Sequence, residues 1–260
     1  MQVTFSSQPA PGGVNEDLVV AGPSWVVVLD GATAPPGVDS GCRHKVRWLV
    51  ERLAARLCRP LTLGTQAPLP DVLATAIAGV RDEHGSGCDL DNPDSPSSTV
   101  ALARVRDDML DYLVLADSAV LLDVAGTVSC VTDARLDHLP EYSVDAVAAR
   151  RNRPDGFWVA STSAEAAYQA RTGSVPLNDV RRFALVSDGV ARYVELLGLG
   201  DWPQLLDALA DDGPDAVVGQ VRAAEATHLG RDPRGPHGRR VKRHDDATAA
   251  YVAVQARNRS

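Results

Sequence analysis

The chain has 260 residues, of which 45% are hydrophobic and 23% are charged. These proportions are ordinary for a soluble globular protein and the length suits one large domain, so disorder is excluded as the main interpretation. A net charge of -8 argues against general binding to nucleic acid or to an acidic membrane surface.

The cysteines and the amino-terminal segment favour a reduced, cytoplasmic location. Cys42, Cys58, Cys88 and Cys130 lie far apart with no Cys-x-x-Cys pair, and no basic segment followed by an apolar core precedes them. No apolar stretch approaches the roughly 20 residues that span a bilayer. We therefore expect a soluble protein without a membrane segment.

The first part of the chain predicts a short strand near residues 3–5 and then a β-hairpin. The apolar runs 18–21 and 25–30 flank a tight Gly-Pro-Ser turn, a pattern typical of antiparallel hairpins. This hairpin would place Glu16 and Asp17 at the same end of the sheet as the end of the second run.

Two helices are expected next, over about 40–58 and 69–83, because apolar residues recur there at helical spacing. We expect them to lie antiparallel against one face of a sheet. The polar segment 85–96 contains three Asp residues without EF-hand spacing, which favours a solvated loop. His84 is expected to be a loop or helix-end residue rather than a ligand.

The middle of the chain predicts a run of strands with short turns, hence an antiparallel meander. Residues 137–176 then predict helices or irregular structure and one short strand. A strand, two helices, a basic loop and a closing strand follow. The meander strands are expected over 98–106, 110–116, 120–124 and 127–131. In the middle, helices or irregular structure are expected over 144–150 and 163–171, with a short strand at 157–159. At the end we expect a strand over 182–187, helices over 202–210 and 214–227, the basic loop 228–244 and a strand over 248–254.

No internal repeat and no linker rich in Gly, Ser and Pro marks a domain boundary. We therefore predict one domain over residues 1–255 and a short polar tail, 256–260. Strands flank two separate helical pairs, which predicts two sheets stacked face to face with helices outside them.

Five of the apolar runs carry a carboxylate at one end, and these ends can converge on one place. Carboxylate and carbonyl oxygens with water are the ligands of Mg²⁺ or Mn²⁺, whereas zinc favours His and Cys. Two such ions roughly 4 Å apart generate a hydroxide and oppose the charge of a phosphoryl group, as in phosphate-ester hydrolysis. The residues are Glu16 and Asp17, Asp30, Asp117, Asp188, and Asp245.

The ordered motifs resemble those of the metal-dependent protein phosphatases of the type 2C class, in a divergent, bacterial-type form. The resemblance spans about residues 1 to 255 and implies an α/β/β/α sandwich with a dinuclear Mn²⁺ or Mg²⁺ centre at one edge of the two sheets. The motifs are Asn15-Glu16-Asp17, Leu29-Asp30-Gly31, Ala116-Asp117-Ser118, Ser187-Asp188-Gly189 and Asp245-Asp246-Ala247-Thr248.

The resemblance also implies a role for each carboxylate of the first ion's site. Asp30 would bridge both ions, and Asp188 and Asp245 would complete the site of the first. The bridging water or hydroxide would attack phosphorus in line, and no phospho-enzyme would form.

The remaining residues of the series are implied to serve other ions. Glu16 and the Gly31 carbonyl would serve the second ion, largely through water, because Gly31 lacks the Cβ that would keep an ion away from its carbonyl. Asp17 would be an outer partner. Asp117 would match the residue that, with Asp188, holds a weaker third ion in some relatives.

Two positions depart from the family pattern. Gly12 occupies the place of an arginine that grips the substrate phosphate, and Ala32 that of a histidine proposed as a general acid. Arg43 and His44 are the nearest replacements in sequence for phosphate binding; the alternative is that both are surface residues.

The resemblance implies a phosphatase that acts on phosphoserine and phosphothreonine in proteins and opposes a bacterial Ser/Thr kinase. The cysteines favour a cytoplasmic location, and the net charge argues against a nucleic-acid or membrane partner. One alternative, motivated by Gly12 and Ala32, is a catalytically weak or inactive member that binds phosphoproteins or metal as a regulatory module. Another is a hydrolase for a small phosphate ester. The basic loop 228–244 precedes Asp245 and suggests a flap that attracts an anionic phosphopeptide; a nucleic-acid contact and a merely flexible loop are the other interpretations.

Overall fold

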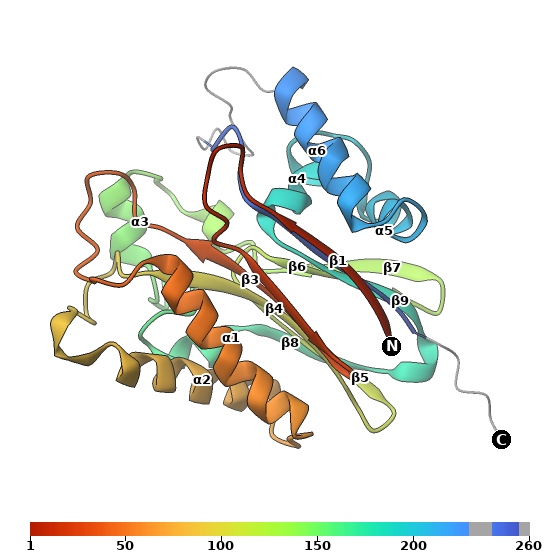
Figure 1. The fold of residues 1–260 in the computed structure, drawn as a ribbon, viewed down its shortest axis with the longest axis horizontal. Helices are drawn as coiled ribbons and strands as arrows, with labels where there is room; N and C mark the ends of the chain where they lie inside the picture. Colours follow the sequence, from red (N-terminus) through yellow and green to blue (C-terminus); the bar gives the residue numbers. More distant parts are fainter. Residues whose placement is uncertain (229–240, 255–260) are drawn as a thin grey trace.

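The computed structural model describes residues 1–228 and 241–254, in which two five-stranded sheets pack face to face between outer helices (Figure 1). Within these residues the paired strands of both sheets run antiparallel. The α+β class and the four layers expected from the sequence are therefore confirmed.

The first sheet has the strand order β1-β10-β9-β6-β7, and the second has the order β2-β3-β4-β5-β8. The strands of the first sheet are β1 (Gln2–Gln8), β6 (Ala119–Val124), β7 (Thr127–Thr132), β9 (Val180–Val186) and β10 (Ala247–Ala253). Those of the second are β2 (Leu18–Gly22), β3 (Trp25–Ala32), β4 (Ser97–Arg106), β5 (Met109–Leu115) and β8 (Arg171–Pro176).

Each sheet has its own helical layer. Helices α1 and α2 pack on the second sheet, whereas α4, α5 and α6 pack on the first (Figure 1). The short helix α3 packs near Leu139, Phe157 and Val159. The helices are α1 (Val46–Thr62), α2 (Leu69–Glu83), α3 (Val144–Arg150), α4 (Asp188–Glu195), α5 (Trp202–Asp211) and α6 (Pro214–His228).

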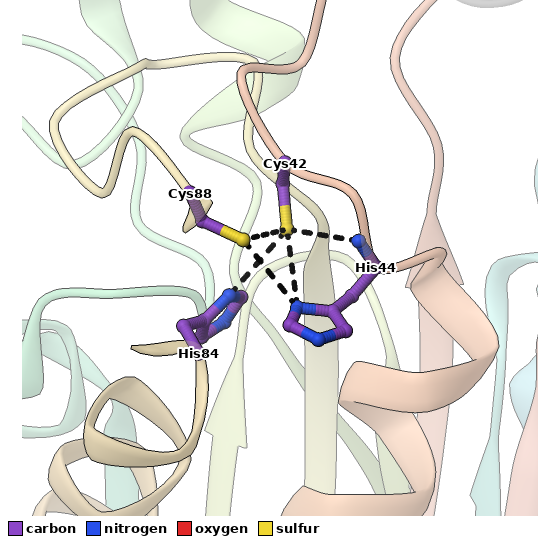
Figure 2. A group of neighbouring side chains, drawn as sticks. All are labelled: Cys42, His44, His84 and Cys88. Carbon is purple, nitrogen blue, oxygen red and sulfur yellow. Dashed lines mark hydrogen bonds between the residues drawn. The ribbon is translucent and has the colours of Figure 1, made fainter. Parts of the chain in front are cut away.

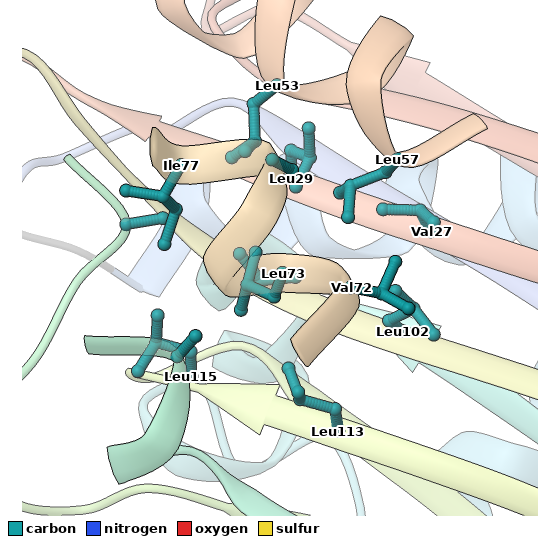
Figure 3. Packing of buried hydrophobic residues seen from close by; sticks show 14 of the residues in the cluster. Val27, Leu29, Leu53, Leu57, Val72, Leu73, Ile77, Leu102, Leu113 and Leu115 are labelled. Carbon is teal, nitrogen blue, oxygen red and sulfur yellow. The ribbon is translucent and has the colours of Figure 1, made fainter. Parts of the chain in front are cut away.

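Alternation along β3 builds two core layers at once. Val27 and Leu29 face α1 and α2, and Val26 and Val28 face the other sheet. Burial of each such side chain contributes roughly 1.5–3 kcal/mol to stability. In Figure 3, leucines of α1 and α2 lie over the outer face of β3, β4 and β5. The all-apolar run is therefore buried on both faces, which fixes the strand that ends at Asp30.

The predicted hairpin is confirmed, since Gly22 pairs with Trp25 across a two-residue turn. The predicted first helix begins later than expected, at Val46, because residues around Cys42 and His44 form a loop with contacts of its own. His84 does cap the end of α2, as predicted.

The prediction that the strands between residues 98 and 131 form one antiparallel meander is wrong. Strands β4 and β5 belong to the second sheet, but β6 and β7 belong to the first. The chain changes sheets at Ala116, whose φ of 65° lies in the left-handed region and produces a sharp turn. Asp117 therefore lies where the chain crosses from one sheet to the other.

One strand and one α-helix of the described residues were not predicted. Strand β8 pairs with β5 in a segment where a helix or irregular structure was expected, and α4 starts at the Asp188-Gly189 pair, which in isolation indicates a turn.

None of the helices in the described part of the chain combines the length and apolarity needed to cross a membrane. The single domain over 1–255 stays a prediction. Its tail, 256–260, and residues 229–240 of the basic loop lie outside the described residues.

Asp111 on β5 makes a buried ionic cluster that should matter for stability. Burial alone would raise the pKa of Asp111, but hydrogen bonds from Arg106, Arg104 and Ser174 outweigh it and hold this pKa below its usual value. The Arg104 side chain is only 4% exposed, so Asp111→Ala would leave a buried cation without its carboxylate.

We expect Asp111→Ala to lower the free energy of unfolding by about 3 kcal/mol, measured by denaturant titration at pH 7. Because the folded-state pKa is depressed, this contribution is present above the ordinary Asp pKa of about 4 and is lost as the pH falls through the depressed value. Equal stability of the variant and the parent at pH 7 would contradict this role.

Candidate metal centre

Strand pairing in the second sheet brings Glu16 and Asp17 to the same end of the sheet as Asp30. Leu18 pairs with Leu29, so the residues that precede β2 lie beside Asp30 at the end of β3. Asp30 itself pairs with Thr99 near the start of β4. The predicted proximity of Glu16-Asp17 to Asp30 therefore follows from the observed register.

The first sheet brings the rest of the series to a common end. Val186, at the end of β9, pairs with Ala119 at the start of β6 and with Ala249 near the start of β10. Asp117 precedes β6, Asp188 follows β9, and Asp245 precedes β10. All three carboxylates must therefore lie at the same edge of this sheet.

A cavity of about 520 Å³ opens where the edges of the two sheets meet. Its lining includes Asp30 and Gly31 from the second sheet, Asp117 from the crossing, and Asp188 and Asp245 from the first sheet. The structure therefore brings these five predicted residues together around one space.

Mutual repulsion raises the pKa values of the carboxylates that line the cavity. The pKa of Asp30 is raised well above its usual value, first by burial and then by repulsion from its acidic neighbours, Asp17 and Asp188 foremost. Burial, with repulsion from Asp245 and Asp117, raises the pKa of Asp188 to about 8. A bound divalent cation would neutralise this repulsion, so the donor set fits Mg²⁺ or Mn²⁺.

Two glycines allow the chain segments of the site to approach one another. A Cβ on Gly189 would meet the backbone carbonyl of Asp246, so only glycine lets the start of α4 lie against the segment before β10. A Cβ on Gly31 would meet the Val46 side chain and the Glu16 backbone. Close packing, rather than access of an ion to the carbonyl alone, therefore requires glycine at position 31.

Glu16 and Asp17 are not among the residues that line the cavity. The Asp246 carboxylate accepts hydrogen bonds from the amides of Ala10 (2.7 Å) and Glu16 (2.6 Å), which ties the loop before β2 to the segment before β10. The Glu16 carboxylate accepts a hydrogen bond from the Thr33 hydroxyl at 2.6 Å. Glu16 is thereby held beside the end of β3.

Asp17 is a buried carboxylate, 1% exposed, whose oxygens have no hydrogen-bond partner of good geometry among the described residues. Burial raises its pKa to about 6, the nearby Thr248 and Ser187 hydroxyls oppose this shift, and Asp246 adds to it. An unsatisfied buried acid beside other acids is costly, and a nearby cation would offset that cost.

Sequence reasoning missed the cations that hold Asp245. Its carboxylate accepts from Arg192 of α4 at 3.1 Å and from Lys242 at 2.8 Å. Arg192 also donates to Glu225 of α6 at 2.9 Å. The signal for Arg192 was its position four residues after Asp188, which puts both on one face of a helix once α4 is known to exist. Nothing in the sequence pattern indicates the distant Glu225.

The phosphate contacts suggested for Arg43 and His44 need correction. Neither residue lines the cavity: His44 contacts Cys42 and Cys88, and the Arg43 side chain packs near Gly87. Both positions are fixed by the loop before α1, which leads away from the carboxylates. Among the described residues, the basic side chains that line the cavity are Arg151, Arg192 and Lys242.

Comparison with solved structures identifies the fold. The structure is similar to the serine/threonine phosphatase PstP/Ppp of Mycobacterium tuberculosis, with 14% identity, 98% of each chain covered and a TM-score of 0.63. It is also similar to PstP in complex with 2 manganese ions, with 13% identity, 98% of each chain covered and a TM-score of 0.61. PppA of Pseudomonas aeruginosa, described as a key regulatory component of T6SS, shares 20% identity over 98% of this chain and 97% of that chain, with a TM-score of 0.60.

A sequence comparison with curated proteins found no match. A sequence profile of the family described as Protein phosphatase 2C matches residues 13–214, which is more than half of the chain. The matched segment contains Glu16, Asp30, Asp117 and Asp188. The chain therefore belongs to the protein phosphatase 2C family, as its motifs suggested.

Proposed function

We propose that the protein is a phosphatase that removes phosphate from phosphoserine and phosphothreonine in proteins and depends on Mn²⁺ or Mg²⁺. The observation that carries this proposal is the cavity at the meeting edges of the two sheets, where carboxylates from separate elements repel one another. Such a set of hard oxygen donors suits two divalent cations and a phosphoryl group.

The chain's own residues divide into three groups around the metal. Asp30, Asp188 and Asp245 would hold it directly, with Asp30 shared between two ions. Glu16 and the Gly31 carbonyl would serve a second ion, largely through water, with Asp17 as an outer partner, and Asp117 would serve a weaker third ion. When bound, the metal supplies an activated water and neutralises phosphoryl charge.

Arg192 and Lys242 orient Asp245 from two sides. Each donates to a different oxygen of its carboxylate, and Arg192 is itself held by the fully buried Glu225. The two cations fix the direction of the Asp245 carboxylate at the cavity wall. They are therefore positioning residues for a metal ligand.

Arg151 is the basic side chain best placed to take over phosphate binding from the missing arginine. It lines the cavity, and its Nε has no hydrogen-bond partner among the described residues. Its other contacts are weak: Nη1 donates to the Ser97 hydroxyl at 3.5 Å, and the guanidinium lies 5.9 Å from the centre of the Phe157 ring. A half-buried guanidinium whose Nε lacks a partner among the described residues suits a phosphate anion.

Arg151→Ala is expected to lower kcat/KM for a phosphopeptide by about tenfold to a hundredfold, because a hydrogen bond to a charged group contributes roughly 1.5–3 kcal/mol. Initial rates across substrate concentrations would measure it. Arg150→Ala is the matched control, since Arg150 pairs with the exposed Asp155 outside the cavity lining. Equal losses in both variants would remove Arg151 from the phosphate site.

A turnover assay tests the proposed function. Phosphothreonine and phosphoserine peptides and an aryl phosphate should be hydrolysed with added Mn²⁺ or Mg²⁺ and not in excess chelator. Unchanged turnover in chelator would exclude the metal-dependent reaction.

The same assay separates the rival functions. Hydrolysis of small metabolites in preference to phosphopeptides would identify a small-ester hydrolase. Calorimetric Mn²⁺ binding without turnover would identify a regulatory binding module. For the phosphatase, the physiological substrates would be proteins phosphorylated by a bacterial Ser/Thr kinase.

A further inference from the structure

A second group of potential ligands lies in the helical layer that covers the second sheet. Cys42 and His44 belong to the segment before α1, His84 ends α2, and Cys88 follows the short 3₁₀ turn Gly85–Gly87. One ligand atom from each of the four residues lies within 4.8 Å of the others. Figure 2 shows the two sulfurs and the two rings turned toward a common centre.

The distances within this group match those between ligands of one tetrahedral ion. The Cys42 sulfur lies 3.4 Å from His84 Nδ1 and 3.7 Å from His44 Nδ1, and the Cys88 sulfur lies 3.4 Å from His44 Nδ1. With zinc bonds of about 2.3 Å to sulfur and about 2.0 Å to nitrogen, tetrahedral geometry separates sulfur from nitrogen by roughly 3.5 Å.

The separation of the two sulfurs also distinguishes a shared ion from a covalent bond. Cys42 Sγ and Cys88 Sγ are 3.3 Å apart, whereas a disulfide bond measures about 2.05 Å. A tetrahedral zinc site would place them roughly 3.8 Å apart, so a small outward movement of one sulfur accommodates the ion.

The surroundings hold the potential ligands in place. The Trp48 ring stacks on His44 with centroids 4.0 Å apart and meets His84 edge-on at 4.8 Å. The His44 amide donates to the Cys42 sulfur at 3.4 Å, a contact of the kind that stabilises a metal-bound thiolate. His84 is 1% exposed, so water has little access to its side of the group.

We propose that Cys42, His44, His84 and Cys88 bind one zinc ion. Two thiolates and two imidazoles form a soft donor set that suits zinc and differs in kind from the carboxylates of the phosphatase cavity. Binding would release one proton from each thiol. With four protein ligands no position is open for substrate, so the ion is structural.

The site would fasten the start of α1 to the end of α2. It would also hold the loop that runs from the end of β3, because the Asp89 amide donates to the Gly41 carbonyl at 2.7 Å and Asn92 donates to the Asp39 carbonyl at 3.1 Å. The zinc site thereby supports the segment that leaves the phosphatase cavity at Thr33.

The sequence signal was present but was not recognised. His84-x-x-x-Cys88 has a spacing typical of zinc ligands, whereas Cys42-x-His44 is shorter and neither is a Cys-x-x-Cys pair. The two halves only meet because α1 and α2 pack antiparallel.

Metal analysis of the purified full chain tests the proposal. The parent and Asp30→Asn, reduced and dialysed after exposure to zinc, should each retain about one zinc per chain in the four-ligand site. Cys88→Ser should lose this ion, and Cys58→Ser should keep it, because Cys58 lies on α1 outside the group. Retention in Asp30→Asn separates this site from the carboxylate cavity, whatever the fate of the proposed phosphatase activity.

Cobalt substitution in the folded parent gives a second readout that does not depend on a variant's folding. Tetrahedral Co²⁺ bound by thiolates has a sulfur-to-metal absorption band, which a carboxylate site lacks. The band should appear in the parent and in Asp30→Asn. Absence of this band from the reduced parent would overturn the proposal. A parent protein that holds no zinc and in which thiol counting shows a Cys42–Cys88 disulfide would also overturn it.

Discussion

Asp30→Asn should lower Mn²⁺-dependent hydrolysis of an aryl phosphate by about a thousandfold or more, since the metal contributes several kcal/mol of transition-state stabilisation. Burial, and then repulsion from Asp17, Asp188, Asp117 and Asp245, raises the pKa of Asp30 well above its usual value. An amide at this position removes the charge that two cations would share. Initial rates at saturating Mn²⁺ would measure the loss.

The stability of the same variant separates a functional loss from misfolding. Burial and like-charge repulsion make an ionised Asp30 costly in the metal-free protein, so Asp30→Asn should melt at the same temperature as the parent or higher. Asp188→Asn should behave likewise, for the same reasons. Asp145→Asn, an exposed carboxylate on α3, is the control and should keep its activity. Full activity in Asp30→Asn would exclude it as a ligand.

Glu225→Ala is expected to lower the free energy of unfolding by about 3–5 kcal/mol, because it leaves buried cations without their partner. The Glu225 side chain is fully buried and accepts from Arg192 at 2.9 Å, Arg222 at 2.9 Å and His244 at 2.7 Å. The change would also release Arg192, and with it the orientation of Asp245. Calorimetry should therefore show a Tm lower by roughly 6–20 °C.

A surface pair provides the matched control for Glu225. Glu51→Ala breaks an exposed ion pair with Arg47 on α1 and should change stability by less than about 1 kcal/mol. Glu225→Gln should fall between the two, because the amide keeps one acceptor for the arginines. A Glu225→Ala protein with the same Tm as the parent would show that the hydrogen bonds of Glu225 do not contribute to stability.

The parts of the fold that could be predicted from sequence are those with local causes. The hairpin of β2 and β3 follows from a short turn between two apolar runs, and α2 follows from apolar residues at helical spacing. The sheet to which β6 belongs is decided by its distant partner β9 and by the turn at Ala116. Nothing within the run of strands itself indicates that change of sheet.

Some residues of the candidate site could be predicted from the sequence and others could not, for the same reason. Asp30 and Asp188 were predictable because a strand that stops at an acid leaves a recognisable pattern, and the family resemblance placed them in order. Arg192 and Glu225 were not, since their importance comes from a contact between α4 and α6 that no spacing records. His44 was assigned to the wrong place because its neighbours come from the far end of α2.

An anomalous-scattering map from crystals soaked in Mn²⁺ would locate the ions directly. We expect peaks in the cavity between the two sheets, in contact with Asp30, Asp188 and Asp245. A map of the soaked, folded protein with no manganese peak beside these three carboxylates would contradict the metal centre and the reaction proposed to depend on it.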